Sequence, residues 1–299
     1  MRMGLMVLLF LTNISFVIII FNYKVTSKNG MILIQCHSII SFIMNFVHIF
    51  EYFGENETFY SENVSYSFFY CYFWKYSTIY WIFTTISIYT MILISFDRFV
   101  CIVFPFYYRK LTKRFTVILT ILVWIFASFV GAFFVLLDLR LEKESVRINN
   151  ETAFYKCTID MTLTNYIFYF CFQCSLPIIS LSILNSISAY VLLINSKTKL
   201  IKFGHVKCLK RYNLFYRFSI STFISTVIYS IVLLCDFFLY IFIFLKRIKF
   251  NSYCVNFYLF FMYLLLTGVT PLVHFVLFKK VRKYIFFIIL CRKCTLNSK

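Results

Sequence analysis

Asp97 and Arg98 are the two residues of the chain whose chemistry is easiest to define. They follow an apolar and aromatic run, residues 81–93, that contains no Asp, Glu, Lys, Arg or His. Pro105 and the basic residues Arg109 and Lys110 come shortly afterwards. A carboxylate beside a guanidinium forms a strong, charge-assisted hydrogen bond. The pattern therefore predicts an ion pair at the point where an apolar helix leaves a membrane.

Catalytic motifs are missing from the rest of the sequence. It has no Gly-rich phosphate loop, no His-Glu-x-x-His, no Cys-x-x-Cys pair with matching histidines and no nucleophile elbow. Its four histidines are scattered. We therefore expect no enzyme activity, no catalytic residues, no metal site and no cofactor.

The composition indicates an all-α membrane protein. The chain has 299 residues, of which 62% are hydrophobic and only 14% charged, far more apolar surface than a soluble domain needs. Helices of about 20 apolar residues cross a bilayer with their backbone hydrogen bonds satisfied. Seven stretches meet that length, and we expect one domain, residues 1–299, with helices at about 3–21, 31–53, 68–96, 115–137, 166–194, 212–245 and 253–278.

The net charge of +19 is better explained by topology than by binding to nucleic acid. Most basic residues lie in alternate connecting segments, at 24–28, 98–114, 197–217 and 279–299, which the positive-inside rule assigns to the cytoplasm. The N-terminus is then extracellular and the C-terminus cytoplasmic. A basic cluster at 246–249 departs from the rule.

Three glycosylation sequons support the same topology. Asn56, Asn63 and Asn150 each begin an Asn-x-Ser/Thr triplet in a segment already assigned to the outside. Asn13 also begins one, but inside a predicted helix, where a buried polar residue is the better interpretation. A secretory signal peptide at Met1 is the alternative for the first helix, and its removal would leave six helices.

Several landmarks resemble those of rhodopsin-like G-protein-coupled receptors. Asp97-Arg98-Phe99 resembles the Asp/Glu-Arg-Tyr signature that closes the third helix of that family, and Pro105 matches a proline of its second cytoplasmic loop. Trp124 and Pro177 lie where the fourth and fifth helices carry a tryptophan and a proline. The segment Thr270-Pro271-Leu272-Val273-His274 resembles Asn-Pro-x-x-Tyr of the seventh helix.

The resemblance extends past the last span. Val281, Ile285, Ile288 and Ile289 recur at helical spacing beside basic residues, the pattern of an amphipathic helix lying on the membrane at about 279–291. Cys291 and Cys294 follow it, where palmitoylation is expected before a short tail, 292–299.

What the resemblance implies is a receptor in the plasma membrane that binds an extracellular ligand and activates a heterotrimeric G protein. In that family Arg98 would be held by Asp97 in the inactive state and would turn to the G protein on activation, with Phe99, Thr270, Pro271 and His274 in the same switch. A disulfide would join Cys71 to Cys157. Tyr80, Thr84 and Asp236 would line the ligand pocket, and a peptide-type or orphan receptor is favoured.

Two landmarks of the family are missing. The second helix carries no Asp, although Asn45 offers a polar substitute, and the sixth helix lacks the family's Trp-x-Pro. Two alternatives therefore stay open: a seven-helix transporter or channel, and a degenerate receptor that no longer signals. The Asp97–Arg98 pair also has a simpler interpretation, an interfacial salt bridge that only anchors the helix.

Overall fold

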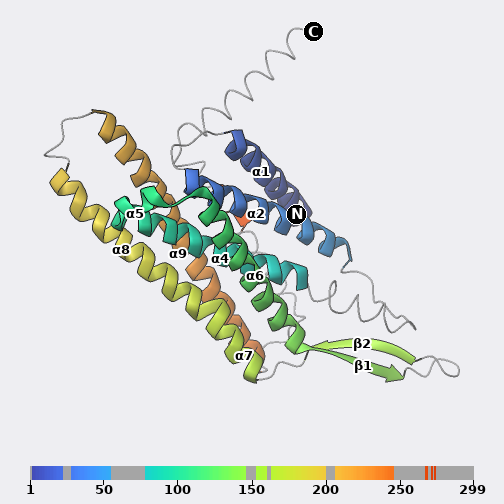
Figure 1. Cartoon of the computed structure of the whole chain (residues 1–299). Coiled ribbons are helices and arrows are strands. Elements are labelled where there is room, and N and C mark those ends of the chain that lie inside the picture. Colours follow the sequence, from blue (N-terminus) through green and yellow to red (C-terminus); the bar gives the residue numbers. More distant parts are fainter. Residues whose placement is uncertain are drawn as a thin grey trace, which may run out of the picture.

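The structure is a computed structural model that describes residues 2–22, 28–54, 78–145, 153–159, 163–199, 206–245, 267–268, 271 and 273. Within these residues the chain is predominantly helical (Figure 1). Its elements are α1 (Arg2–Asn22), α2 (Lys28–Gly54), α4 (Thr78–Val103), α5 (Pro105–Lys110), α6 (Lys113–Asp138), β1 (Leu139–Ser145), β2 (Ala153–Ile159), α7 (Leu163–Tyr169), η2 (Phe170–Ser175), α8 (Leu176–Lys199) and α9 (Val206–Phe244).

Five helical segments in this part of the chain are long and apolar enough to cross a membrane. They are Asn29–Phe50, Thr78–Val103, Lys113–Phe133, Ile167–Leu192 and Ser219–Leu239. A shorter apolar segment, Met6–Ile18, lies in α1. Of the predicted last span, 253–278, four residues are described, and all four are helical. The predicted surface helix at 279–291 lies outside the described residues.

The helix predicted to end at residue 96 continues to Val103 in α4. The prediction placed its end at the Asp97–Arg98 pair, but two charges do not break a helix. The break comes at Phe104, whose backbone angles are φ −122° and ψ 60°, because Pro105 disfavours the helical conformation in the residue before it. Pro105 then starts α5, since a proline lacks only an N–H that the first turn leaves unpaired.

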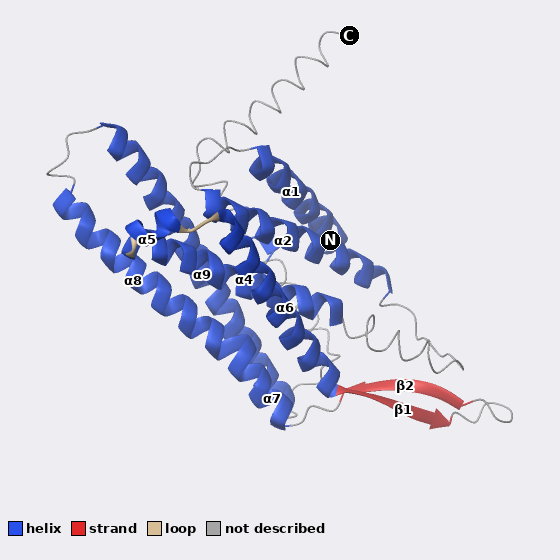
Figure 2. Cartoon of the chain, viewed as in Figure 1, coloured by secondary structure: helices blue, strands red, loops and turns tan. Residues whose placement is uncertain are grey.

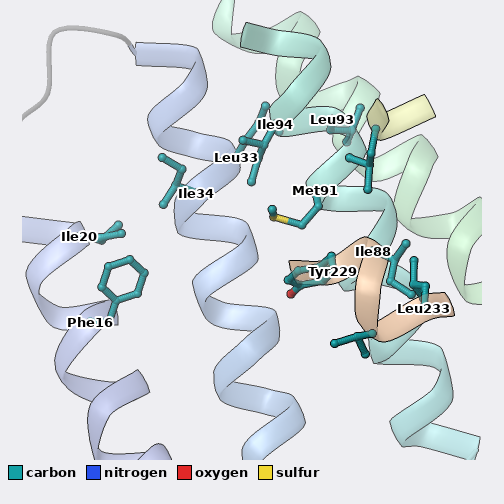
Figure 3. Packing of buried hydrophobic residues seen from close by; sticks show 12 residues of the cluster. Phe16, Ile20, Leu33, Ile34, Ile88, Met91, Leu93, Ile94, Tyr229 and Leu233 are labelled. Carbon is teal, nitrogen blue, oxygen red and sulfur yellow. The ribbon is translucent and has the colours of Figure 1, made fainter. Parts of the chain in front are cut away.

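Helix α4 lies at the centre of the bundle, where it packs against α2, α6, α8 and α9. Figure 3 shows the main hydrophobic cluster, to which α1, α2, α4, α8 and α9 contribute. Its labelled members are Phe16 and Ile20 of α1, Leu33 and Ile34 of α2, Ile88, Met91, Leu93 and Ile94 of α4, and Tyr229 and Leu233 of α9. Because apolar side chains gain little by leaving lipid for one another, close packing and interhelical hydrogen bonds must hold such a bundle together.

Strands β1 and β2 form an antiparallel hairpin that projects beyond the end of α6, the departure from the predicted all-α fold (Figure 2). The predicted loop here alternates apolar and charged residues, which is a strand pattern. In the register of the two strands Leu139 pairs with Ile159, Leu141 with Cys157 and Glu142 with Lys156.

The helix predicted at 166–194 is not one regular helix. It begins at Leu163 and ends at Lys199, and between α7 and α8 the six residues Phe170–Ser175 form a π-helical turn. Pro177 follows this turn and is buried. A proline cannot donate the hydrogen bond of a regular turn, and π turns are one way in which a helix adapts to such an interruption.

Candidate functional site

The Asp97–Arg98 pair is buried at the end of α4. Nη2 of Arg98 lies 3.0 Å from Oδ2 of Asp97, and the two side chains are only 4% and 8% exposed. Burying charged groups is costly unless they are paired and hydrogen-bonded. The site therefore depends on the groups that neighbouring helices supply to these two side chains.

One such group is the hydroxyl of Tyr108 in α5. It donates a hydrogen bond of 3.0 Å to Oδ1 of Asp97. Each carboxylate oxygen of Asp97 thus has a different neighbour, Tyr108 on one side and Arg98 on the other. The break at Phe104 makes this possible, because it turns the chain so that α5 lies against the end of α4.

The start of α2 forms another side of the site. The guanidinium of Arg98 lies so close to the backbone of Gly30 that a Cβ added there would overlap Nη2 and would stand 2.8 Å from both Cζ of Arg98 and Oδ2 of Asp97. The preceding residue, Asn29, donates a hydrogen bond of 3.3 Å to the carbonyl oxygen of Leu111, just after α5. Helices α2, α4 and α5 therefore meet at the ion pair.

The surface beside this site is aromatic and basic. Phe106 and Tyr107 of α5 are 79% and 70% exposed. The exposed basic residues of the same surface are Arg109, Lys110, Lys113 and Arg114. Phe99, the third residue of the predicted switch, is half-buried, with its ring edge-on to that of Phe104. We call this the α5 surface.

Polar side chains link the helices in the middle of the bundle. Nε1 of Trp124 on α6 donates to Oγ1 of Thr90 on α4 at 3.0 Å. The hydroxyl of Tyr229 on α9 lies 3.2 Å from Oγ of Ser87 on α4 and 3.4 Å from Nε2 of His37 on α2. Trp124 was predicted as a landmark, and the structure places it against α4; sequence reasoning did not find Tyr229 or its contacts.

Asn185 forms a second polar junction, nearer the ion pair. Its Nδ2 lies 3.2 Å from Oγ of Ser95 on α4 and 3.2 Å from Oγ1 of Thr226 on α9, and also 2.8 Å from the carbonyl oxygen of Leu181 on its own helix. Ser95 stands two residues before Asp97 in α4. The junction ties α8 and α9 to the helix that carries the ion pair.

The residues predicted to line a ligand pocket lie on two helices. Tyr80 and Thr84 occupy successive turns of α4, and the ring of Tyr80 lies beside that of His48 on α2. Asp236 is buried on α9, and on the same helix the carbonyl oxygen of Leu233 accepts a hydrogen bond from Sγ of Cys174 in the π turn at 3.8 Å. In the same turn, Nε2 of Gln173 donates to Oγ1 of Thr85 at 2.9 Å. Tyr80 therefore contacts α2, whereas the part of α9 that carries Asp236 packs against η2.

Asn13, predicted as a buried polar residue, is buried and its Nδ2 lies 3.4 Å from the carbonyl oxygen of Thr267. Asn45 is also buried, and donates to the carbonyl oxygen of Ser41 on its own helix at 2.8 Å. Pro271 is buried and helical. Cys157 lies in β2. The other predicted site residues fall outside the described part of the chain: Asn56, Asn63, Cys71, Asn150, Thr270, His274, Cys291 and Cys294.

Gly30 and Tyr108 are the parts of the site that sequence reasoning missed. A signal for Gly30 was present, because the whole chain has only 6 glycines and one of them opens an apolar run. Tyr108 had none, since it is one of 23 tyrosines. Comparison with known proteins adds no relative from which roles can be transferred: no protein-family model and no curated protein matches the chain.

Proposed function

We propose that the chain is a rhodopsin-like G-protein-coupled receptor: a seven-helix bundle with a surface helix at 279–291, in the plasma membrane with its N-terminus outside. The observation that carries the proposal is the buried Asp97–Arg98 pair at the end of an apolar helix that contacts most of the bundle. Tyr108 donates a hydrogen bond to this pair. An ion pair that only anchored a helix at the membrane surface would be expected to face solvent and to need no partners from α2 and α5.

The proposed mechanism is a change between two arrangements of the same bundle. In the inactive arrangement Asp97 holds Arg98. A ligand that binds better to the other arrangement shifts the population toward it, and only its difference in affinity does so. For Arg98 to reach a partner, α8 and α9 must separate from α4 at this end, which requires the contacts of Asn185 with Ser95 and Thr226 to break.

The α5 surface is the proposed contact for the heterotrimeric G protein. Exposed aromatic residues beside basic ones suit a protein partner, since aromatic side chains provide most of the energy in protein interfaces. Phe106 and Tyr107 are the most exposed large apolar side chains of this surface. The remaining predicted cytoplasmic segments contribute further positive charge, which would also attract anionic lipid.

At the opposite end of α6, we assign the hairpin of β1 and β2 to the extracellular side. Its strand β2 carries Cys157, the proposed partner of Cys71 in a disulfide. The proposed receptor is of the peptide or orphan type. Tyr80, Thr84 and Asp236 are the proposed contacts of its ligand. The sequons at Asn56, Asn63 and Asn150 would carry glycans on the same side.

The test is ligand-independent G-protein activation in cells, measured with dissociation sensors for each class of G protein. Asp97→Asn is expected to raise basal activity, because Arg98 loses its charged partner. Arg98→Ala is expected to abolish it. Arg140→Ala, which removes an arginine of β1 on the proposed extracellular side, is the control that should change basal activity far less than Arg98→Ala.

Tags at the two ends of the chain test the topology independently. The N-terminal tag should be reached by antibody on intact cells, and the C-terminal tag only after permeabilisation. Tags on the same side would rule out seven spans. Correct topology with no G-protein response to Asp97→Asn would favour a degenerate receptor, whereas solute or ion flux through reconstituted protein would favour a transporter or channel.

A further inference from the structure

Gly30 and Arg98 form a contact that no side chain at position 30 would permit. We propose that Gly30 is a positioning residue for Arg98: the backbone of α2 at Gly30 packs against the guanidinium and keeps it beside Asp97. We call this contact between Gly30 and Arg98 the seat, and it stabilises the ion pair. The signalling consequence rests on the proposed function, whereas the seat itself can be tested on the folded protein alone.

Backbone geometry does not explain a glycine here. Gly30 lies inside α2 and does not adopt the left-handed conformation in which glycine is favoured. In a helix, glycine is less favourable than alanine because it loses more backbone freedom on folding. Space is therefore the reason that the structure offers, since an added Cβ would overlap Nη2 of Arg98.

Two other glycines show what distinguishes this position. At Gly4 an added Cβ would meet nothing within 4 Å. At Gly131 of α6 it would lie 2.9 Å from the backbone Cα of Ile82, so that α6 and α4 would have to move apart. At Gly30 the obstacles are the ends of two side chains: the guanidinium of Arg98, which the Cβ would overlap, and Oδ2 of Asp97 at 2.8 Å. The bundle can therefore accept a Cβ at position 30 if these two side chains move away.

The neighbours of Gly30 keep the seat in place. Asn29 bonds to the carbonyl oxygen of Leu111, which fixes the start of α2 against the segment that follows α5. Tyr108 of α5 holds the other oxygen of Asp97. A Cβ at position 30 would overlap the guanidinium and would press on Oδ2 of Asp97, whose other oxygen Tyr108 holds, so it would separate Arg98 from the carboxylate. Within the proposed function, this displacement favours the signalling arrangement.

The experiment is a double-mutant cycle on the full chain in lipid nanodiscs, with the midpoint of thermal unfolding as the measurement. Gly30→Ala should lower the midpoint by about 2–4 °C, the shift expected for a modest loss of stability. In the Arg98→Ala background the same change should not lower it, because the overlap with the guanidinium is gone, the Asp97 carboxylate that Arg98 no longer holds can shift away from the added methyl group, and alanine is the better helix former. Gly30→Ala is therefore expected to lower the unfolding midpoint only when Arg98 is present.

Matched variants separate this seat from ordinary packing. Gly131→Ala should lower the midpoint equally in both backgrounds, and Gly4→Ala should lower it in neither. In protein labelled with [15N]arginine, the guanidino signals of Arg98, identified by their loss in Arg98→Lys, should shift in Gly30→Ala and not in Gly4→Ala. An equal loss from Gly30→Ala in both backgrounds, or failure of both the single and the double variant to fold, would overturn the proposal.

Signalling is the second arm. Gly30→Ala should raise basal G-protein activation roughly twofold or more by shifting the population of the two arrangements. Gly30→Ala combined with Arg98→Ala should show no such gain. Thermal coupling and an NMR shift without any signalling by Asp97→Asn or Gly30→Ala would support the seat and reject the receptor function. Signalling by Asp97→Asn without thermal coupling between Gly30→Ala and Arg98→Ala would support the receptor function and reject the seat.

Discussion

The indole Nε1 of Trp124 donates a hydrogen bond of 3.0 Å to Oγ1 of Thr90, and this contact joins α6 to α4 in the middle of the bundle. The same hydroxyl donates its proton to the carbonyl oxygen of Ile86 at 2.6 Å. Thr90 therefore acts as donor and acceptor at once, and the indole supplies the only proton of the link between the two side chains.

Trp124→Phe should destabilise the protein by about 1 kcal/mol, the net value of a buried hydrogen bond. Combined with Thr90→Val, it should show a coupling energy of about 0.6–1.7 kcal/mol, the range measured for hydrogen bonds between membrane helices. Thermal unfolding in nanodiscs gives both values. A control cycle pairs Trp124→Phe with Ser182→Ala, an exposed serine of α8, and should be additive. Additivity with Thr90→Val as well would contradict the link.

Tyr108→Phe removes the hydroxyl that donates to Asp97. A hydrogen bond to a charged group contributes about 1.5–3 kcal/mol, so the unfolding midpoint should fall clearly. Basal G-protein activation should rise, because the ion pair loses one of its supports. Tyr190→Phe removes the same single atom from an exposed tyrosine of α8 and should leave both measurements near the wild-type values. Equal effects of the two variants would exclude a specific role of Tyr108.

Tyr229→Phe tests the link between α2, α4 and α9. The ring is fully buried and lies 6.2 Å from that of His37, so Phe keeps the packing and loses the hydroxyl between Ser87 and His37. We expect a loss of about 1 kcal/mol. The ring nitrogen signals of His37 should shift in [15N]histidine spectra. Tyr190→Phe, on the exposed face of α8, is the control; unchanged His37 signals in Tyr229→Phe would disprove the contact.

Asn185→Leu tests the junction of α8 with α4 and α9. Leucine has the same branched arrangement of heavy atoms but cannot donate to Ser95 or Thr226. The loss should be modest, about 0.6–1.7 kcal/mol. Basal G-protein activation should rise at the same time, since the junction resists the separation of α8 and α9 from α4. Ser186→Ala, at the exposed neighbouring position, should leave basal activation unchanged. Lower stability without a rise in signalling would limit Asn185 to a structural role.

Long apolar runs made the helices predictable. Residues 31–53 and 115–137 were predicted as helices, and α2 and α6 cover both ranges. The ends were less certain, because a helix end depends on local backbone preferences: α4 passes Asp97 and Arg98 and ends only before Pro105. The hairpin was missed because its alternating pattern was interpreted as a charged loop.

The candidate site was predictable only in part. Asp97 and Arg98 stand out in the sequence because charges are rare in an apolar run. Tyr108 and Gly30 do not, since their roles arise from the way α5 and α2 pack against the end of α4. Tertiary contacts of this kind leave no periodic signal in the chain. The predicted roles in signalling, ligand binding, glycosylation and palmitoylation stay predictions.

The π turn at Phe170–Ser175 has a consequence for insertions and deletions. Such a turn holds one residue more than an α-helical turn, so α7 is rotated by about 100° relative to an uninterrupted continuation of α8. Tyr169, the last residue of α7, is buried edge-on to Trp81 in this orientation. Deleting one residue from the turn would restore a regular helix and swing the Tyr169 ring out of the bundle. Natural variants are therefore expected to keep the length of this segment even where its residues are substituted.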